Sequence, residues 1–274
     1  MKLKWISYPY IVWMIIFILL PLFLILFYSV TYNTSEGLGF TLEYFQRFFE
    51  PIYINVLWRS FKLALVSTGV CLLLGYPMAM ILADKELKNR NVMVLLFIIP
   101  MWMNFLLRTY AWMTLLERNG ILNSLLGLLN IAPKDFLYNE GAVILGMVYN
   151  FLPFMVLPIY SVLIKIDKNL LEAAGDLGAN SATTFRKIIL PLSIPGVLSG
   201  VTMVFMPAVT TFVIPRLLGG GQFTLIGNLI EQQFLFVGDW GFGSAVSVIM
   251  LILILISMGV MGKYEKEQEG GGLW

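Results

Sequence analysis

The sequence predicts an all-α, polytopic membrane protein with six transmembrane helices, organised as a single domain over residues 1–274. Hydrophobic residues make up 59% of the chain and charged residues only 12%, and the mean hydropathy is +0.84. A soluble domain carries roughly 25% charged residues. Long apolar runs alternate with short charged segments, as expected for helices that cross roughly 30 Å of hydrocarbon several times.

Six apolar runs have the length of a membrane span, and they cover residues 8–30, 58–83, 92–116, 141–164, 192–214 and 243–262. The first run is too long for a signal peptide and no small-residue cleavage site follows it, so we expect a retained helix. Residues 31–57 and 117–140 are predicted as polar loops, the second with a short interfacial helix at 121–129. Residues 216–242 are predicted as a glycine-rich loop with a helix near 225–236. Residues 270–274 differ in composition and are expected to be a cloning remnant.

Basic residues gather in alternate connecting segments. The amino terminus, residues 84–91, residues 165–187 and the tail contain Lys2, Lys4, Lys85, Lys88, Arg90, Lys165, Lys168, Arg186, Lys187, Lys263 and Lys266. The other segments contain only Arg47, Arg118, Lys134 and Arg216. By the positive-inside rule, we expect a multi-pass protein of the bacterial inner membrane with both termini on the cytoplasmic side.

The composition excludes several classes of function. The chain has no histidine, which removes histidine-based triads and the usual zinc and haem ligands, and Cys71 is its only cysteine. The dipeptide Gly262-Lys263 is followed by Tyr264 and lacks the earlier glycine of a P-loop. We therefore expect no catalytic residue, metal or cofactor in this chain. The net charge of +2 is too small to suggest a nucleic-acid partner.

A polar segment at residues 165–191 interrupts the membrane-like sequence between the fourth and fifth spans. Asn169 and Glu172 have the spacing of a capping box, which predicts the start of a short helix. Gly178 can supply a left-handed turn that ends this helix, and Ser181 can cap a second helix that runs toward Pro191. The local sequence therefore predicts a helix, a turn and a helix.

The same segment carries a longer pattern, E-A-A-x-x-x-G-x(9)-I-x-L-P, matched at every fixed position by Glu172, Ala173, Ala174, Gly178, Ile188, Leu190 and Pro191. In this pattern and place the chain resembles permease subunits of type I, binding-protein-dependent ABC importers. The resemblance implies a cytoplasmic coupling helix that sits in a groove of a separate ATPase, which binds ATP and Mg²⁺. Closure of the ATPase dimer would then tilt the adjoining spans. A solvated loop helix, in which Glu172 only supports the helix dipole, is the structural alternative.

Further stretches resemble the PotB-type permeases of spermidine/putrescine importers. They include residues 74–79 (Leu-Gly-Tyr-Pro-Met-Ala), 100–112, 119–123, 152–160, 225–228 and 239–243 (Asp-Trp-Gly-Phe-Gly). Gly241 departs from the family pattern, which has proline there. The resemblance implies an ATPase dimer, a second homologous permease and an extracytoplasmic polyamine-binding protein as partners, within the lipid bilayer.

A polyamine is a flexible polycation, and its path should offer carboxylates for the ammonium groups and aromatic faces for the methylenes. The candidate pathway residues are Trp102, Tyr110, Tyr149, Glu231, Asp239 and Trp240. Each also fits an interfacial aromatic belt or a solvated or docking carboxylate. Arg108 is a like charge within the third span, where it can snorkel outward or pair with an acid of a partner subunit.

Three alternatives remain to be weighed. An ABC importer permease for a sugar, ferric chelate or thiamine would share the Glu172 pattern. An ion-coupled carrier acting alone would need paired acids within the membrane, and the spans offer almost none. An intramembrane enzyme would need a metal-ligand cluster or a serine–lysine pair, for which no arrangement is evident.

Overall fold

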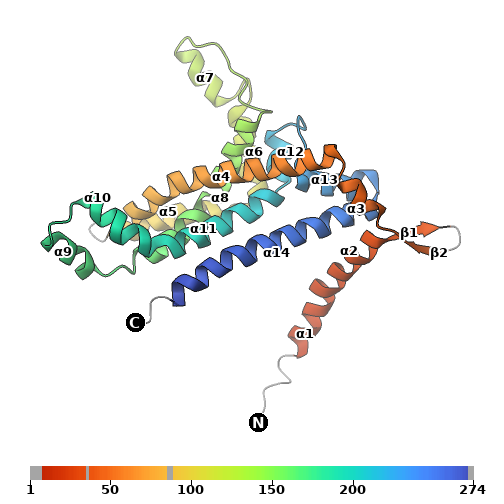
Figure 1. The fold of residues 1–274 in the computed structure, drawn as a ribbon. Helices are drawn as coiled ribbons and strands as arrows, with labels where there is room; N and C mark the ends of the chain where they lie inside the picture. The colour runs from red at the N-terminus through yellow and green to blue at the C-terminus, as the bar shows by residue number, and fades with distance from the viewer. Residues whose placement is uncertain (1–7, 35–36, 85–88, 271–274) are drawn as a thin grey trace.

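The computed structural model describes residues 8–34, 37–84 and 89–270, and these residues are mostly helical (Figure 1). Lys2, Lys4, Lys85 and Lys88 and the end of the expected cloning remnant lie outside the described residues. In chain order the α-helices (α), π-helices (η) and strands (β) are α1 (Tyr8–Met14), η2 (Ile15–Leu19), α2 (Leu20–Val30), β1 (Thr31–Thr34), β2 (Gly37–Phe40), α3 (Glu43–Phe48), α4 (Pro51–Ala83), α5 (Arg90–Trp102), α6 (Phe105–Leu116), α7 (Ile121–Leu128), α8 (Glu140–Leu163), α9 (Lys168–Asp176), α10 (Ser181–Thr184), η3 (Phe185–Ile189), α11 (Leu190–Thr210), α12 (Val213–Leu218), α13 (Ile226–Gln232), η4 (Gln233–Val237) and α14 (Trp240–Gly270).

The long helices confirm the predicted membrane class. Within the described residues, five helical stretches are long and apolar enough to cross a membrane: Tyr8–Val30, Pro51–Ala83, Glu140–Leu163, Ser181–Thr210 and Trp240–Val260. A bent pair, Arg90–Trp102 with Phe105–Leu128, makes a sixth if it is counted as one span. The short helices predicted at 121–129 and near 225–236 are present as α7 and as α13 with η4.

The centre of the bundle is formed by α4, α8 and α11, and α14 packs against α2 and α11 (Figure 1). Two glycines of α11 allow its backbone to approach α8 closely. A Cβ atom at Gly200 would lie 2.9 Å from the Met155 sulfur, and one at Gly196 would lie 2.9 Å from the Pro158 carbonyl oxygen. Close packing at small residues is the usual basis of helix association in lipid, where burial of apolar surface contributes little.

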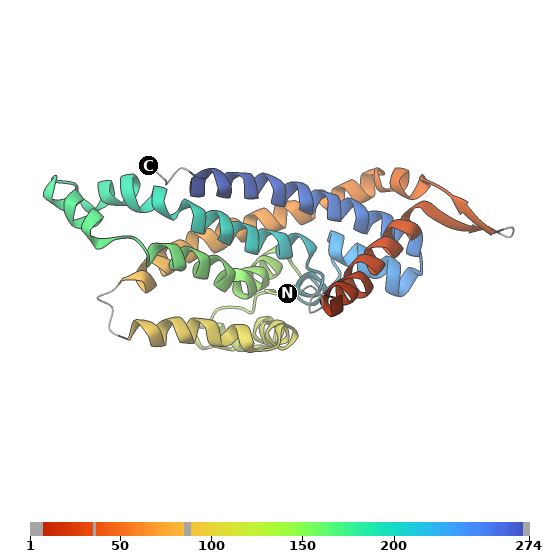
Figure 2. The ribbon, with the colours of Figure 1, turned by 90° about the horizontal axis from the view of Figure 1, so that it is seen from below.

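The expectation that residues 31–57 form a loop is wrong. Strands β1 and β2 form an antiparallel hairpin in which Thr31 pairs with Phe40, and α3 follows it. Helix α4 then begins at Pro51, before the predicted start at residue 58. Extended Glu50 precedes Pro51, and proline at the first position of a helix loses no intrahelical hydrogen bond. The hairpin projects from the end of the molecule opposite α9 (Figure 2).

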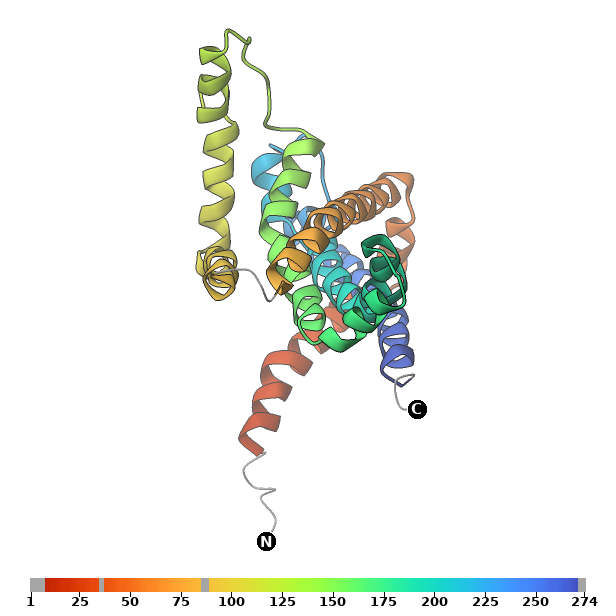
Figure 3. The ribbon, with the colours of Figure 1, turned by 90° about the vertical axis from the view of Figure 1, so that its left-hand side faces the viewer.

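The third predicted span, residues 92–116, is not one straight helix. Helix α5 ends at Trp102, and the helical stretch that starts at Phe105 is inclined by 94° to it. Asn104 caps the new helix, because its side-chain oxygen accepts hydrogen bonds from the backbone N–H groups of Leu106 (2.8 Å) and Leu107 (3.3 Å). In Figure 3, α6 and α7 stand at a steep angle to the neighbouring bundle helices.

The fifth span begins earlier than predicted. The helix runs without interruption from Ser181 to Thr210, so α10, η3 and α11 are one rod rather than a loop helix followed by a span. A π-turn at Phe185–Ile189, closed by the bond from the Leu190 N–H to the Phe185 carbonyl, precedes Pro191. Such a turn adjusts the backbone locally where proline cannot donate a hydrogen bond.

Candidate functional site

Helix α9 forms one extreme end of the molecule (Figures 1 and 2). Its amino-terminal cap is Asp167, whose carboxylate accepts a hydrogen bond from the Asn169 N–H at 3.0 Å. The predicted cap, Asn169, is instead inside the first turn, so that expectation is wrong. Both residue types can cap a helix, and the extended backbone at Asp167 decides between them.

The predicted end of α9 at Gly178 is confirmed. Gly178 has a φ angle of +79°, in the left-handed region. Its N–H donates to the Gly175 carbonyl (2.8 Å), and the Ala179 N–H donates to the Ala174 carbonyl (2.9 Å). This pair of bonds is the Schellman arrangement that closes a helix with glycine.

The second helix of this segment is capped one residue earlier than predicted. The Asn180 side chain accepts a hydrogen bond from the Thr183 N–H at 2.8 Å, whereas Ser181 is already the first helical residue. Ile188 lies in η3, and Leu190 and Pro191 begin α11. The sequence pattern therefore joins an exposed short helix to a rod that runs into the bundle.

The exposed side chains of the segment include both pattern residues and one that the pattern omits. Glu172 and Ala173 are exposed and Ala174 is buried. Leu177, next to Gly178, is 89% exposed. Its apolar side chain is therefore open to contact with another protein. In the sequence, only the position of Leu177 directly before Gly178 could have indicated that this side chain is exposed.

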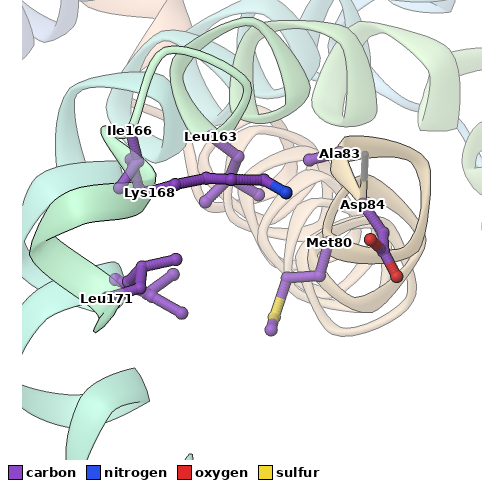
Figure 4. A pocket seen from close by; sticks show the side chains of 8 residues that line it. Met80, Ala83, Asp84, Leu163, Ile166, Lys168 and Leu171 are labelled. Carbon is purple, nitrogen blue, oxygen red and sulfur yellow. The ribbon is translucent and has the colours of Figure 1, made fainter. Parts of the chain in front are cut away.

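A cavity lies between α9 and the neighbouring end of the bundle. A cavity of about 180 Å³ separates the end of α4 from α9 (Figure 4). Its lining residues are Met80, Ala83, Asp84, Leu163, Ile166, Lys168, Leu171 and Ile189. In Figure 4 the Lys168 side chain extends across the cavity toward the end of α4. Helix α9 therefore borders a cavity on its side toward α4.

The opposite end of the molecule holds the two candidate pathway carboxylates, each beside an arginine. Glu231 lies 2.6 Å from Arg216, and Asp239 lies 2.8 Å from Arg47. Asp239 also accepts a hydrogen bond from the Phe242 N–H at 3.0 Å, which caps α14. Both carboxylates thus have structural partners within the chain.

The candidate aromatic residues do not form one cluster. Trp102 is 79% exposed at the end of α5. Tyr149 packs edge-to-face on Trp112, with ring centroids 5.2 Å apart, while Tyr110 is partly exposed on α6. Trp240 shares a cavity of about 430 Å³ with Asp239 and with Tyr28, Tyr32 and Tyr44 at the start of α14.

The break between α5 and α6 is a second irregular region. Met103 is extended and exposed, beside exposed Trp102. Backbone that leaves a helix at membrane depth is tolerated where it lines a water-filled path or is covered by protein. Arg108, on α6, is only 7% exposed, and its Nε atom has no hydrogen-bond partner among the described residues.

The described residues contain no group of three or more His, Cys, Asp or Glu side chains that could hold a metal ion. The structure thus has the short helix α9 at one end, two ion pairs at the other end and the broken helix α5–α6 between them.

Comparison with known proteins identifies the family. Residues 72–268 match the family described as "Binding-protein-dependent transport system inner membrane component". The chain belongs to this family. The match covers the broken span, the segment at residues 165–191 and most of α14, and it makes the chain a membrane component of a transport system.

Two curated relatives are similar over most of their length. The spermidine/putrescine transport system permease protein PotB of Haemophilus influenzae is 40% identical over 262 residues, which are 93% of this chain and 91% of the relative. The protein of the same name from Escherichia coli is 41% identical over 256 residues, 91% of each chain. The resemblance to PotB-type permeases is confirmed.

Solved structures of low identity share the fold. A chain of a bacterial ABC transporter involved in the import of the acidic polysaccharide alginate aligns with a TM-score of 0.77 at 18% identity, over 96% of both chains. A chain of the MetNI methionine ABC transporter aligns with a TM-score of 0.57 at 16% identity, over 79% of this chain and 96% of the other. The type I ABC importer permease fold predicted from the sequence is confirmed.

Proposed function

We propose that this chain is one of two permease subunits of an ATP-driven polyamine importer of the bacterial inner membrane. The observation that carries the proposal is its 40% identity, over 93% of its length, to a permease named for spermidine and putrescine transport. A complete match to the coupling pattern, which begins on the exposed helix α9, supports the same function. The chain performs no chemistry, and a partner ATPase dimer binds ATP and Mg²⁺.

In this proposal α9 couples the ATPase to the membrane helices. Exposed Glu172 pairs with a basic side chain in a groove of the ATPase, and exposed Ala173 allows close approach, whereas Ala174 is buried within the chain. Leu177 adds an apolar contact. A displacement of α9 passes through the short turn at residues 177–180 to the rod formed by α10, η3 and α11, in which Ile188, Leu190 and Pro191 carry it into the bundle.

The orientation follows from the distribution of charge. Lys168 starts α9, and Lys165, Arg186 and Lys187 lie on either side of it, so by the positive-inside rule this end faces the cytoplasm, as do both termini. The opposite end, with Asp239 and the hairpin, then faces an extracytoplasmic polyamine-binding protein.

A second, homologous permease completes the pathway. Helices α1 and η2 have no buried residue, and in Figure 3 they lead away from the bundle. The α5–α6 break is likewise exposed at Trp102. Lipid and the second subunit would cover these surfaces. We propose Trp102, Tyr110, Tyr149, Glu231, Asp239 and Trp240 as pathway residues, with the two acids reached by cargo on the outer side.

The test is ATP hydrolysis by the reconstituted complex with its binding protein, in the presence of spermidine, putrescine, maltose or ferric ion. Stimulation by spermidine or putrescine alone supports the proposal. Stimulation by maltose or ferric ion would keep the coupling mechanism but assign the permease to the alternative, another small solute.

A further inference from the structure

One side chain connects α4 to the rod that leads from the coupling segment. The Tyr76 hydroxyl lies 2.7 Å from the Ser193 hydroxyl, 117 residues away in the chain. Ser193 is fully buried and donates to the Leu190 carbonyl at 2.9 Å, so the Tyr76 O–H donates to Ser193. The Tyr76 ring also meets Phe185 edge-to-face, with centroids 5.8 Å apart and planes at 88°.

Both helices are irregular where Tyr76 connects them. Pro77, the next residue, cannot donate to the carbonyl four residues earlier in α4. On the other side, Phe185 starts the π-turn η3, and Pro191 follows it. Kinks and π-turns are the points at which long helices bend. Tyr76 thus joins two helices at points where the regular hydrogen bonding of each is interrupted.

Near Tyr76, α4 is packed on α8 and also borders a cavity. One residue before Tyr76, Gly75 is buried against α8, where a Cβ atom would lie 3.0 Å from Met155 and 3.3 Å from Val156. One turn after Tyr76, Met80 lines the cavity beneath α9, while Ala79 and Leu82 stay buried in the core. Helix α4 therefore keeps its packed face beyond Tyr76, beside a space into which α9 can move.

We propose that the Tyr76–Ser193 hydrogen bond is the pivot at which movement of the coupling segment is passed to the membrane helices. The segment from α9 to η3 moves as a lever over the cavity, which takes up the displacement without disturbing the packed core. Tyr76 holds the base of the lever against α4, so α4 and α11 move together. This inference rests on the proposed coupling function of α9, and Tyr76 acts as a positioning residue.

The first experiment compares Tyr76→Phe with Tyr160→Phe in the reconstituted complex with its ATPase, second permease and binding protein. Tyr160, on α8, has no described hydrogen bond from its hydroxyl and serves as the matched control. The readouts are basal ATP hydrolysis and spermidine taken up per ATP. Tyr76→Phe should leave assembly and basal hydrolysis unchanged and lower uptake per ATP about 3- to 10-fold, as expected for one lost hydrogen bond. Tyr160→Phe should match the unmodified protein.

Two further variants separate a pivot from a purely structural contact. Ser193→Ala should lower uptake per ATP as Tyr76→Phe does, and the double variant should be no worse than either single variant, because both remove the same bond. Ala83→Leu adds side-chain volume to the cavity and should lower spermidine-stimulated hydrolysis while leaving basal hydrolysis intact.

The inference is overturned if Tyr76→Phe lowers thermal stability but leaves uptake per ATP unchanged. It is also overturned if the double variant lowers uptake per ATP by the combined effect of Tyr76→Phe and Ser193→Ala. Glu172→Ala distinguishes a failure of the pivot from a failure of the proposed coupling function of α9. If Glu172→Ala uncouples transport and Tyr76→Phe does not, only the pivot is wrong. If Glu172→Ala also transports normally, the coupling proposal itself fails.

Discussion

The Asp239 carboxylate, at the start of α14, lies 2.8 Å from the guanidinium of Arg47 on α3, 192 residues earlier in the chain. Arg47 also donates to the Tyr53 hydroxyl at 3.2 Å and lies over the Phe242 ring, 4.2 Å from its centroid. The pair therefore fastens α3 and the start of α4 to α14. Asp239 has a structural role in addition to the pathway role proposed for it, and the two roles can be separated.

Arg47→Gln and Asp239→Asn should each lower stability by about 0.5–1 kcal/mol, the range for partly exposed ion pairs. Thermal unfolding of the purified permease in detergent measures this loss. If Asp239 also binds cargo, only Asp239→Asn should lower spermidine-stimulated ATP hydrolysis in the complex. Equal stimulation in the two variants would remove Asp239 from the pathway and leave its structural role.

Gly241 departs from the family pattern for a reason visible in the packing. A Cβ atom at Gly241 would overlap the Tyr44 ring, so the missing side chain provides the space for that ring. Gly241→Ala should destabilise the permease by about 1–3 kcal/mol, the usual cost of overpacking, as measured by thermal unfolding.

The control for Gly241→Ala is Gly259→Ala in the same helix, where nothing lies within 4 Å of the added atom. That variant should be neutral or slightly stabilising, because alanine favours helix over glycine. The double variant Tyr44→Ala with Gly241→Ala should lose less stability than the sum of the losses in the two single variants. Additive losses would contradict the contact.

Gly178 and Gly175 provide a matched pair on α9. Neither has an atom within 4 Å of an added Cβ, but only Gly178 has a positive φ, +79°. Gly178→Ala should strain the turn by roughly 1–2 kcal/mol and displace α10 relative to α9, which lowers uptake per ATP. Gly175→Ala should preserve uptake, since an alanine within a helix strengthens it. Comparable uptake by both variants would count against a role for the turn geometry.

Leu177 tests whether the exposed end of α9 is a contact surface. Leu177→Ser should leave the stability of the isolated permease within about 0.5 kcal/mol, as for most surface changes. It should nevertheless weaken binding of the ATPase, measured by co-purification and by titration of hydrolysis with ATPase. Leu128→Ser, at an 80% exposed leucine on α7, is the control and should not affect ATPase binding. Unchanged binding in both variants would remove Leu177 from the interface.

Replacement of Arg108 is expected to affect the stability of the isolated chain and the assembly of the complex differently. Replacement of a poorly satisfied buried charge by an apolar residue of similar volume is often neutral or stabilising, by about 1–4 kcal/mol. Arg108→Met should therefore not destabilise the isolated permease in thermal unfolding. If the second permease supplies a carboxylate to Arg108, the same variant should weaken assembly of the two subunits. Destabilisation of the isolated chain would instead indicate a partner within it.

Much of this protein was decided by the sequence alone. Apolar length determines how many helices can span a membrane, and helix ends such as Gly178 depend on the backbone preference of one residue. The spacing from Glu172 to Pro191 could be matched to the family pattern because such a pattern is local in the chain, and the coupling role that it predicts stays a proposal.

Only the tertiary structure decided the rest. Asp167 and Asn169 are both competent caps, and the direction of the incoming chain selects Asp167. The break at Asn104 depends on where α6 can pack, since asparagine within an apolar run is compatible with a continuous helix. The pairs Arg47–Asp239 and Tyr76–Ser193 join residues more than one hundred positions apart. No local preference specifies such contacts, because they exist only once the helices have packed.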